Sequence, residues 1–210
     1  MGTDSMKACN KCKKSEEIDA KNKERKIIMN TKYELIPVTD STLYRIKALK
    51  SFGDICKGDI GGLIATEDNL TVYGDAWVYG NAMVSENAKI YGNSRVYNKA
   101  KVSGNAMVYG EAIIDGNAKV YENAKVYGDA KVYGNSRVNG DAKVYGNARV
   151  FGDAQVSGNA EVYRNAMVSE NAEVFGDAQV SGAAQVYGDS KVSGDAWVFG
   201  DAEVYGDANE

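Results

Sequence analysis

A six-residue phrase repeats without interruption through most of the chain. Residues 72–209 form 23 consecutive hexads with no inserted residue between them. Position three is usually glycine, and position four is usually asparagine or aspartate. Position one is valine except at Ile90 and Ile114, and position five is alanine except at Ser94, Ser136 and Ser190. A repeat of fixed period indicates stacked structural units, so this feature limits the fold more than any other.

The period of six excludes the simplest elements. An α-helix places apolar residues about every 3.6 positions and a plain strand every two. A period of six fits if each hexad forms one short strand and one corner. We therefore predict four residues of alternating strand, with positions five and one directed inward and positions six and two directed outward. Glycine and the following Asn or Asp turn the corner, because glycine lacks a Cβ and Asn tolerates left-handed backbone well.

The corner residues vary together. Five hexads lack the glycine at position three; the residues there are Glu86, Asn98, Glu122, Arg164 and Glu170. In four of these hexads the next residue is Asn, namely Asn87, Asn123, Asn165 and Asn171. Asn is enriched among non-glycine residues with positive φ. We therefore predict that position four takes the positive φ where glycine is missing.

The outward position two shows a longer period of three hexads. Its first series is aromatic in seven of eight hexads and reads Tyr73, Tyr91, Tyr109, Tyr127, Tyr145, Tyr163, Ser181 and Phe199. The second series is aromatic in six of eight hexads and the third in only two of seven. Because the three series differ in their aromatic content, we predict a triangular coil of three hexads with three faces. The third face, rich in Ser and Lys, is expected to face solvent.

The hexad resembles that of left-handed parallel β-helix proteins, which have an aliphatic residue, a small residue four later and three hexads per coil. Left-handedness is implied by this resemblance alone. The stretch TKYELIPVTDSTLYRIKAL, followed by KGDIGGLIATEDNL, resembles small bacterial and phage-type hexapeptide-repeat proteins that carry an acyltransferase label. The expected fold class is all-β: a single-stranded left-handed parallel β-helix, triangular, with a small N-terminal β cap.

The chain divides into three segments by composition. Residues 1–30 are charged and poor in apolar side chains, and we expect a flexible arm. Residues 31–70 are expected to form a β-hairpin and cap, with strands at 33–36 and 42–49 around Pro37 and Asp40. Residues 71–210 carry the hexapeptide-repeat β-helix.

Two sequence features bear on chemistry. The arm contains CNKC at Cys9 and Cys12, which is half of a zinc site; a tetrahedral site would need two chains or Cys56. The acyltransferases that the repeat resembles use a histidine as general base and build their sites from loops that interrupt the coils. This chain contains no histidine and no such loop. We therefore expect a protein that is not an enzyme and that uses no cofactor.

The first aromatic series is the candidate binding surface. Its tyrosines are Tyr73, Tyr91, Tyr109, Tyr127, Tyr145 and Tyr163, and we group with them Arg95, Lys131 and Arg149, which occupy position six of the same hexads. Stacking along a sheet explains such a ladder without a function. An exposed aromatic strip equally indicates an interface, which predicts a homo-oligomer, either a dimer or a trimer. Bases could stack between these tyrosines, but the net charge of −4 argues against nucleic acid.

The favoured function is a non-catalytic β-helical rod that self-associates or presents a repetitive surface to a partner protein. The alternative is an oligomeric decoy, phage-related by resemblance, that binds a nucleotide-like or acyl small molecule. An acyltransferase-like enzyme is the third reading. No apolar run approaches the roughly 18 residues that span a bilayer, and three cysteines are too few for a disulfide framework. We therefore expect a cytoplasmic protein with no membrane partner.

Overall fold

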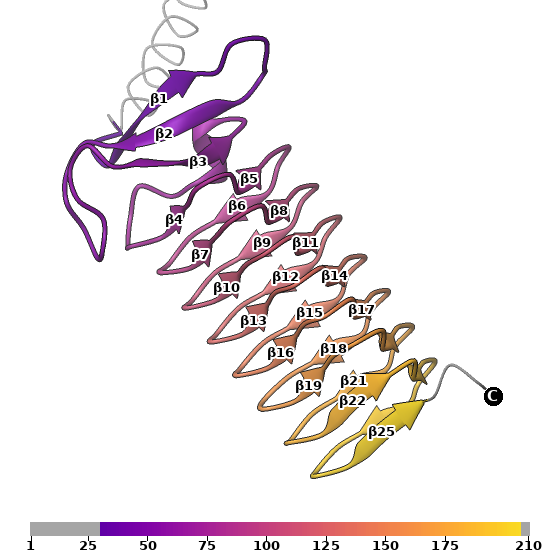
Figure 1. Cartoon of the computed structure of the whole chain (residues 1–210). Coiled ribbons are helices and arrows are strands. Elements are labelled where there is room, and N and C mark those ends of the chain that lie inside the picture. The colour runs from indigo at the N-terminus through magenta and orange to yellow at the C-terminus, as the bar shows by residue number, and fades with distance from the viewer. Residues whose placement is uncertain (1–29, 207–210) are drawn as a thin grey trace, which may run out of the picture. The chain divides into compact units, whose positions relative to one another are not determined.

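The computed structural model describes residues 30–206, and within this range the hexads stack as parallel coils (Figure 1). Each interior repeat strand pairs with the strands one coil before and one coil after it: Val126 lies opposite Val108 and Val144. The coil therefore contains three hexads, and the chain is an all-β parallel solenoid with three sheets, as predicted. The handedness of the coil stays a prediction from the resemblance.

We call the seven-stranded sheet the tyrosine sheet, because it carries the first aromatic series. Its strands in chain order are β6 (Lys89–Ile90), β9 (Met107–Val108), β12 (Lys125–Val126), β15 (Lys143–Val144), β18 (Glu161–Val162), β21 (Gln179–Val180) and β24 (Trp197–Val198).

The eight-stranded sheet carries the second aromatic series and is called the mixed sheet. Its strands are β4 (Trp77–Val78), β7 (Arg95–Val96), β10 (Ile113–Ile114), β13 (Lys131–Val132), β16 (Arg149–Val150), β19 (Met167–Val168), β22 (Gln185–Gly188) and β25 (Glu203–Gly206).

The ten-stranded sheet continues from the repeat into the N-terminal segment and is called the cap sheet. Its strands are β1 (Tyr33–Pro37), β2 (Tyr44–Ala48), β3 (Ile60–Ile64), β5 (Met83–Val84), β8 (Lys101–Val102), β11 (Lys119–Val120), β14 (Arg137–Val138), β17 (Gln155–Val156), β20 (Glu173–Val174) and β23 (Lys191–Val192).

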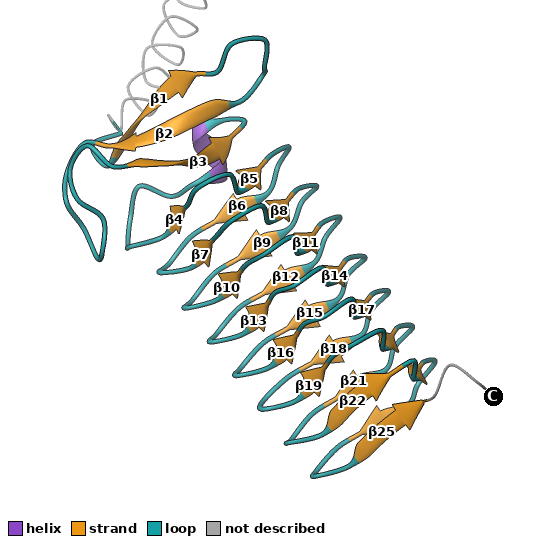
Figure 2. Cartoon of the chain, in the orientation of Figure 1, coloured by secondary structure: helices purple, strands orange, loops and turns teal. Residues whose placement is uncertain are grey.

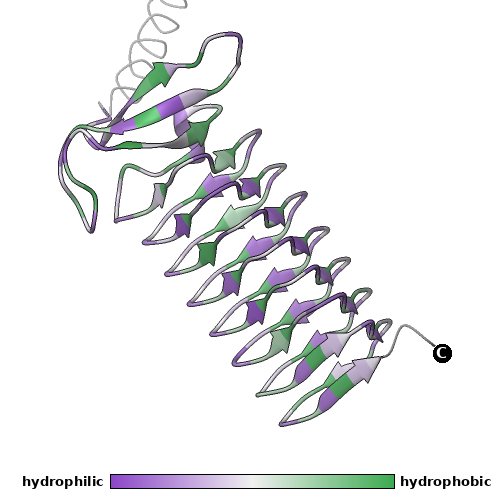
Figure 3. Cartoon of the chain, in the orientation of Figure 1, coloured by the Kyte–Doolittle hydropathy of each residue, from purple (hydrophilic) through white to green (hydrophobic). Residues whose placement is uncertain are grey.

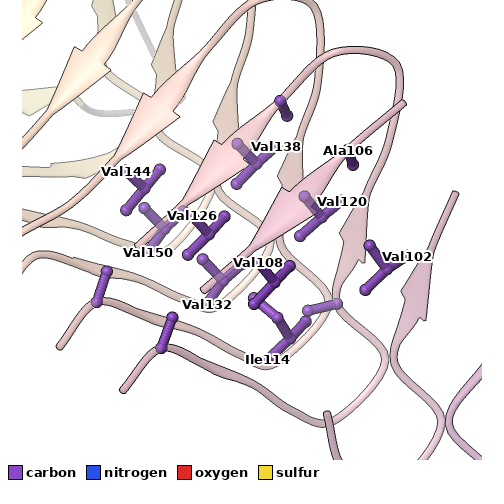
Figure 4. Close-up of a cluster of buried hydrophobic side chains, with 14 of the residues drawn as sticks. Val102, Ala106, Val108, Ile114, Val120, Val126, Val132, Val138, Val144 and Val150 are labelled. Carbon is purple, nitrogen blue, oxygen red and sulfur yellow. The ribbon is translucent and has the colours of Figure 1, made fainter. Parts of the chain in front are cut away.

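Valine and alanine fill the interior of the coils, as the inward positions predicted. Side chains at positions one and five are fully buried through the central coils, and Figure 4 shows the valines stacked in columns. Hydropathy accordingly alternates within every coil (Figure 3). Where Ser94 replaces alanine, its hydroxyl donates to the carbonyls of Tyr91 and Val108, at 2.8 and 3.1 Å. The buried serine therefore brings no unsatisfied donor into the core.

The regular strands of the repeat are mostly two residues long, shorter than the four predicted, and corners separate them (Figure 2). Hydrogen bonding nevertheless continues around the corners. The amides of Tyr127, Asp129 and Lys131 donate to carbonyls of the next coil, at 3.0, 2.8 and 2.9 Å. The backbone amides at positions two, four and six therefore all donate to the next coil, so backbone hydrogen bonding extends well beyond the two-residue strands.

The predicted location of positive φ is wrong. In every hexad that lacks glycine, the residue at position three itself adopts the left-handed conformation, with φ from 56° at Glu86 to 63° at Arg164. The Asn that follows is not among the residues with positive φ. The corner is fixed by the backbone path that all hexads share, so position three takes this conformation whichever residue stands there.

Asparagine at position four has a different role, which is to form side-chain ladders along the corners. The Nδ2 of Asn105 donates to Oδ1 of Asn123, at 3.0 Å, and Asn123 donates in turn to Asp141, at 3.1 Å. In this ladder each amide donates toward the carboxyl end. Aspartate, which can only accept when ionised, ends the ladder.

Glutamate at position three also reaches a neighbouring coil. The carboxylates of Glu86, Glu122 and Glu170 accept hydrogen bonds from the amides of the glycines one coil later, at 2.7, 2.6 and 2.9 Å. These contacts give the three glutamates a partner that the sequence pattern did not indicate.

The N-terminal segment covers the first coil. Strands β1 and β2 pair antiparallel, β2 pairs antiparallel with β3, and β3 runs parallel to β5. A short 3-10 helix, η1 (Glu67–Asn69), follows β3. The buried Lys32 ammonium donates to the carbonyl of Ala76, at 2.8 Å, and lies 4.6 Å from the ring centre of Phe52. Burial lowers the pKa of Lys32 to about 8.

Candidate functional site

The candidate surface is the outer side of the tyrosine sheet. Five rings, those of Tyr91, Tyr109, Tyr127, Tyr145 and Tyr163, stack in one continuous ladder. Successive ring centres are 4.8, 4.8, 4.9 and 5.0 Å apart, and no interplanar angle exceeds 6°. The spacing equals the distance between neighbouring strands, so the sheet itself sets the stack.

Stacking determines which part of each ring is presented outward. The interior rings, such as Tyr127, have a ring on both sides and are half-buried. Their edges, not their faces, therefore meet solvent. Tyr73, the first tyrosine of the predicted series, is 69% exposed and has no ring partner among residues 30–206. The ladder accordingly has five members, not the six expected.

Three of the five tyrosine hydroxyls, those of Tyr91, Tyr145 and Tyr163, contact residues of the next coil. Tyr145 donates to Oε2 of Glu161, at 2.9 Å, and Tyr163 donates to Oε1 of Gln179, at 3.3 Å. The hydroxyl of Tyr91 lies 3.8 Å from the sulfur of Met107. Burial raises the pKa of Tyr145, and the hydrogen bond to Glu161 raises it further. The ladder is therefore held by its stacked rings and by three of its hydroxyls.

One ion pair lies on this surface. The ammonium of Lys143 is 2.8 Å from Oε1 of Glu161. The hydrogen bond from Lys143 lowers the pKa of the Glu161 carboxyl, and the same bond raises the pKa of Lys143. Both groups are thus held in their charged forms.

The predicted grouping of basic residues with the ladder is wrong. Arg95, Lys131 and Arg149 lie on the mixed sheet, in β7, β13 and β16. Position six follows the corner and begins the strand of the next hexad, so it belongs to the next face. The structure therefore brings the tyrosines together and places the three basic residues on a different side of the coil.

The residues that do flank the ladder come from position six of the preceding hexads. They are Lys89, Met107, Lys125, Lys143, Glu161, Gln179 and Trp197. The sequence contains the signal for this assignment, because a side chain two positions before another on a strand shares its face. This surface is less basic than predicted, and the tyrosine–arginine alternation that suggested base stacking is absent from it.

A hollow of about 530 Å³ lies beside the amino-terminal end of the ladder. Its lining includes Asn69 of η1, Asn87 and Asn105 of the corner, and Lys89 and Met107 of the tyrosine sheet. The Asn69 amide donates to the carbonyls of Glu86 and Ala88, both at 2.9 Å. Asn69 thus fixes the wall of the hollow instead of offering its donors to a ligand.

The metal prediction concerns residues outside the described range, since Cys9 and Cys12 precede residue 30. The third cysteine, Cys56, is exposed. Within residues 30–206, no three or more His, Cys, Asp or Glu side chains gather closely enough to hold a metal ion. Across the same residues, no helix has both the length and the apolar character that crossing a bilayer requires.

The comparisons with known proteins agree with the fold. A family model described as YdcK Beta solenoid repeat matches residues 100–116, 142–158 and 154–170. Each match covers about one coil of the structure. A search of curated proteins found no significant match. With its parallel coils of three hexads and these three matches, the chain is a β-solenoid repeat protein.

Proposed function

We propose that the chain works as a non-catalytic β-solenoid rod and that the tyrosine sheet is its contact surface, forming a dimer or trimer of identical chains. The observation that carries this proposal is the five-ring ladder, in which three hydroxyls also contact the next coil. Tyrosine is enriched at protein interfaces because it combines a large apolar surface with a hydrogen-bonding group. The ladder repeats this side chain over about 20 Å at the spacing of the strands.

Order within the ladder favours association. Binding normally costs about 0.5–1.5 kcal/mol for each flexible side chain that an interface immobilises. Tyr109 and Tyr127 already lie between neighbouring rings, and Tyr145 is also bonded to Glu161. Little further freedom is lost when a second copy covers them, so the surface is preorganised for contact.

The composition of the chain supports a role other than catalysis. The sequence contains no histidine, and its hexads are not interrupted by a loop that could enclose a substrate. A general base would then have to be a carboxylate or a lysine with a strongly shifted pKa. A lysine base needs a lowered pKa and a carboxylate base a raised one. On the tyrosine sheet the pKa of Lys143 is raised and that of Glu161 is lowered, because each group is stabilised in its charged form.

The test is the mass of the full chain in solution, measured by light scattering at micromolar concentration. We expect the parent chain to be a dimer or trimer. The double variant Tyr109→Ser and Tyr127→Ser should have a lower mass while keeping the circular dichroism of the parent. Both side chains point outward, so their loss leaves the valine core in place.

The matched control is the double variant Tyr133→Ser and Phe151→Ser on the mixed sheet. These rings also stack, with centres 5.0 Å apart and planes 2° apart. The control removes one ring pair from another face, so it should keep the parent's mass. A monomeric parent, or equal effects of the two double variants, would refute the tyrosine sheet as the interface.

A further inference from the structure

Three positively charged side chains lie in register on the outer side of the cap sheet. Lys119 in β11 lies opposite Lys101 in β8 and Arg137 in β14. All three are exposed, and within residues 30–206 none of these side chains has a hydrogen-bond or ion-pair partner. Neighbouring strands are about 4.8 Å apart, so three like charges stand at a spacing that is unfavourable without an anion.

Elsewhere in the repeat, positively charged residues at position six either pair with a carboxylate or form shorter runs. On the tyrosine sheet Lys143 pairs with Glu161, at 2.8 Å, and on the cap sheet Lys191 lies 3.5 Å from Glu173. On the mixed sheet the unpaired neighbours Lys131 and Arg149 are flanked by Ile113 and Met167. The triad on the cap sheet is thus the longest run of uncompensated positive charge among the repeat strands.

A single aromatic ring lies beside the triad. Tyr121 follows β11 directly, and its neighbours one coil away at the same hexad position are Ser103 and Asn139. In the described part of the chain its half-buried ring has no aromatic partner, unlike the rings of the ladder, so no stacked ring competes with a ligand for its faces. Lys101, Ser103, Lys119, Tyr121 and Arg137 together line a groove of about 410 Å³.

We propose that this groove binds a nucleoside polyphosphate, with its phosphates along the triad and its base on Tyr121. Adjacent phosphates supply several negative charges over a few ångströms, which matches three cations at strand spacing. The base is planar, and a base of any identity stacks favourably on an aromatic ring. The columns that carry Tyr121 and Lys119 are two residues apart along the strand, about 6.6 Å, which leaves room for the sugar between them.

The limits of the groove favour a short anion over a nucleic acid strand. On the cap sheet the triad is preceded by Met83 and followed by Gln155 and Glu173. A strand of nucleic acid would meet an uncharged and then a negatively charged side chain on leaving the groove. Phe175 is the other aromatic residue at position two on this face, and it follows Glu173 with no run of cations beside it.

Isothermal titration calorimetry on the full chain, at low ionic strength, tests the proposal with two probes. Inorganic triphosphate reports on the triad alone, whereas ATP reports on the triad and the ring together. We expect both to bind and ATP to bind more tightly. Lys119→Gln should weaken both probes about tenfold, the loss expected for one charge-assisted hydrogen bond.

Two further variants separate the contributions. Tyr121→Ser should weaken ATP and leave triphosphate unchanged, because the ring contacts only the base. Lys131→Gln is the matched control, since Lys131 is an exposed lysine at the same hexad position on the mixed sheet, and it should change neither affinity.

Several outcomes would overturn the proposal. These are no heat with either probe, equal losses from Lys119→Gln and Lys131→Gln, or a Tyr121→Ser variant that weakens both probes alike. Tighter binding of a thymidine oligonucleotide than of ATP would assign the groove to a nucleic acid strand instead. Since none of these variants touches the tyrosine ladder, the solution mass measured for the interface stays an independent result.

Discussion

The tyrosine sheet and the cap sheet are built from the same hexad, yet their outer surfaces differ. Tyr127 and Tyr121 occupy the same position in consecutive hexads, and both are half-buried. Tyr127 lies between the rings of Tyr109 and Tyr145, whereas Tyr121 has no ring partner in the described part of the chain. One surface therefore presents ring edges in a fixed row, and the other presents an unstacked ring beside three cations.

The difference shows where each property of the solenoid is encoded. Inward positions and corners are nearly the same in every coil, so they specify the fold and cannot distinguish one face from another. Outward positions vary, and their neighbours lie one full coil away in sequence. The role of an outward side chain therefore depends on the residues one coil before and after it.

The largest expected effect concerns the corner that joins the two sheets. A Cβ at Gly104 would lie 2.6 Å from the amide nitrogen of Glu122, and the residue has a φ of +68°. We expect Gly104→Ala to lower the free energy of unfolding by about 3 kcal/mol, from left-handed strain and overpacking together. Urea denaturation followed by circular dichroism measures this change.

Gly80→Ala is the matched control for the corner. Gly80 has a similar φ, +58°, but a Cβ there would meet only the carbonyl oxygen of Asn98, at 3.8 Å. It should therefore cost only the strain, about 1–2 kcal/mol. Equal losses for the two variants would show that contact between coils at the corner is unimportant.

The next effect tests the two tyrosines directly. Tyr127→Ser removes two stacked contacts and should cost about 2 kcal/mol, because each aromatic pair contributes about 0.5–1.5 kcal/mol beyond its buried area. Tyr121→Ser removes no stacked contact and should cost less than about 1 kcal/mol. Urea midpoints of the two variants at equal protein concentration make the comparison, and a larger loss for Tyr121→Ser would contradict the proposed difference between the sheets.

Much of the fold was predictable because the inward positions carry the same type of side chain in every hexad: Val or Ile at position one, and Ala or Ser at position five. Val at position one and Ala or Ser at position five indicated the inward direction, and the aromatic series at position two indicated a coil of three hexads. Both predictions are confirmed by the burial and the strand pairing. Periodicity carries this information because each coil meets the same packing requirement.

The site was predicted less well, for two physical reasons. The chain turns at positions three and four, so position six lies on the same strand as position one of the next hexad. The prediction placed Arg95 on the face of its own hexad's position two, which is the wrong face. Positive φ was assigned by residue preference, although the shared backbone path imposes it on Glu122 at position three. Whether the ring of Tyr121 stacks on another ring depends on residues a full coil away, which the composition of the face does not reveal.

A smaller effect is expected at position four of the same corner. Asn123→Val removes one hydrogen bond from Asn105 and one to Asp141, both exposed, and should cost about 1 kcal/mol. No strain is added, since Asn123 does not have positive φ. Thermal and urea denaturation should both place this variant above Gly104→Ala in stability, and a loss as large as that of Gly104→Ala would mean that position four bears the strain after all.

The smallest expected effect is electrostatic and separates the paired lysine of the tyrosine sheet from the unpaired lysines of the cap sheet. The hydrogen bond from Lys143 lowers the pKa of Glu161 below its ordinary value of 4.5. The unfolded chain therefore binds more protons than the folded chain in this range. The contribution of the pair is present above about pH 4.5 and is lost as the pH falls through the lowered pKa.

Because both side chains are partly exposed, solvent screens the pair, and we expect only a few tenths of a kcal/mol. Urea midpoints measured as the pH falls from neutral to about 3 should decrease slightly less steeply in Glu161→Gln and in Lys143→Gln than in the parent. Lys119→Gln, which removes an unpaired cation from the cap sheet, should leave the decrease of the urea midpoint with falling pH as steep as in the parent. Identical slopes in the parent and in Glu161→Gln would mean that the pair contributes nothing to folding.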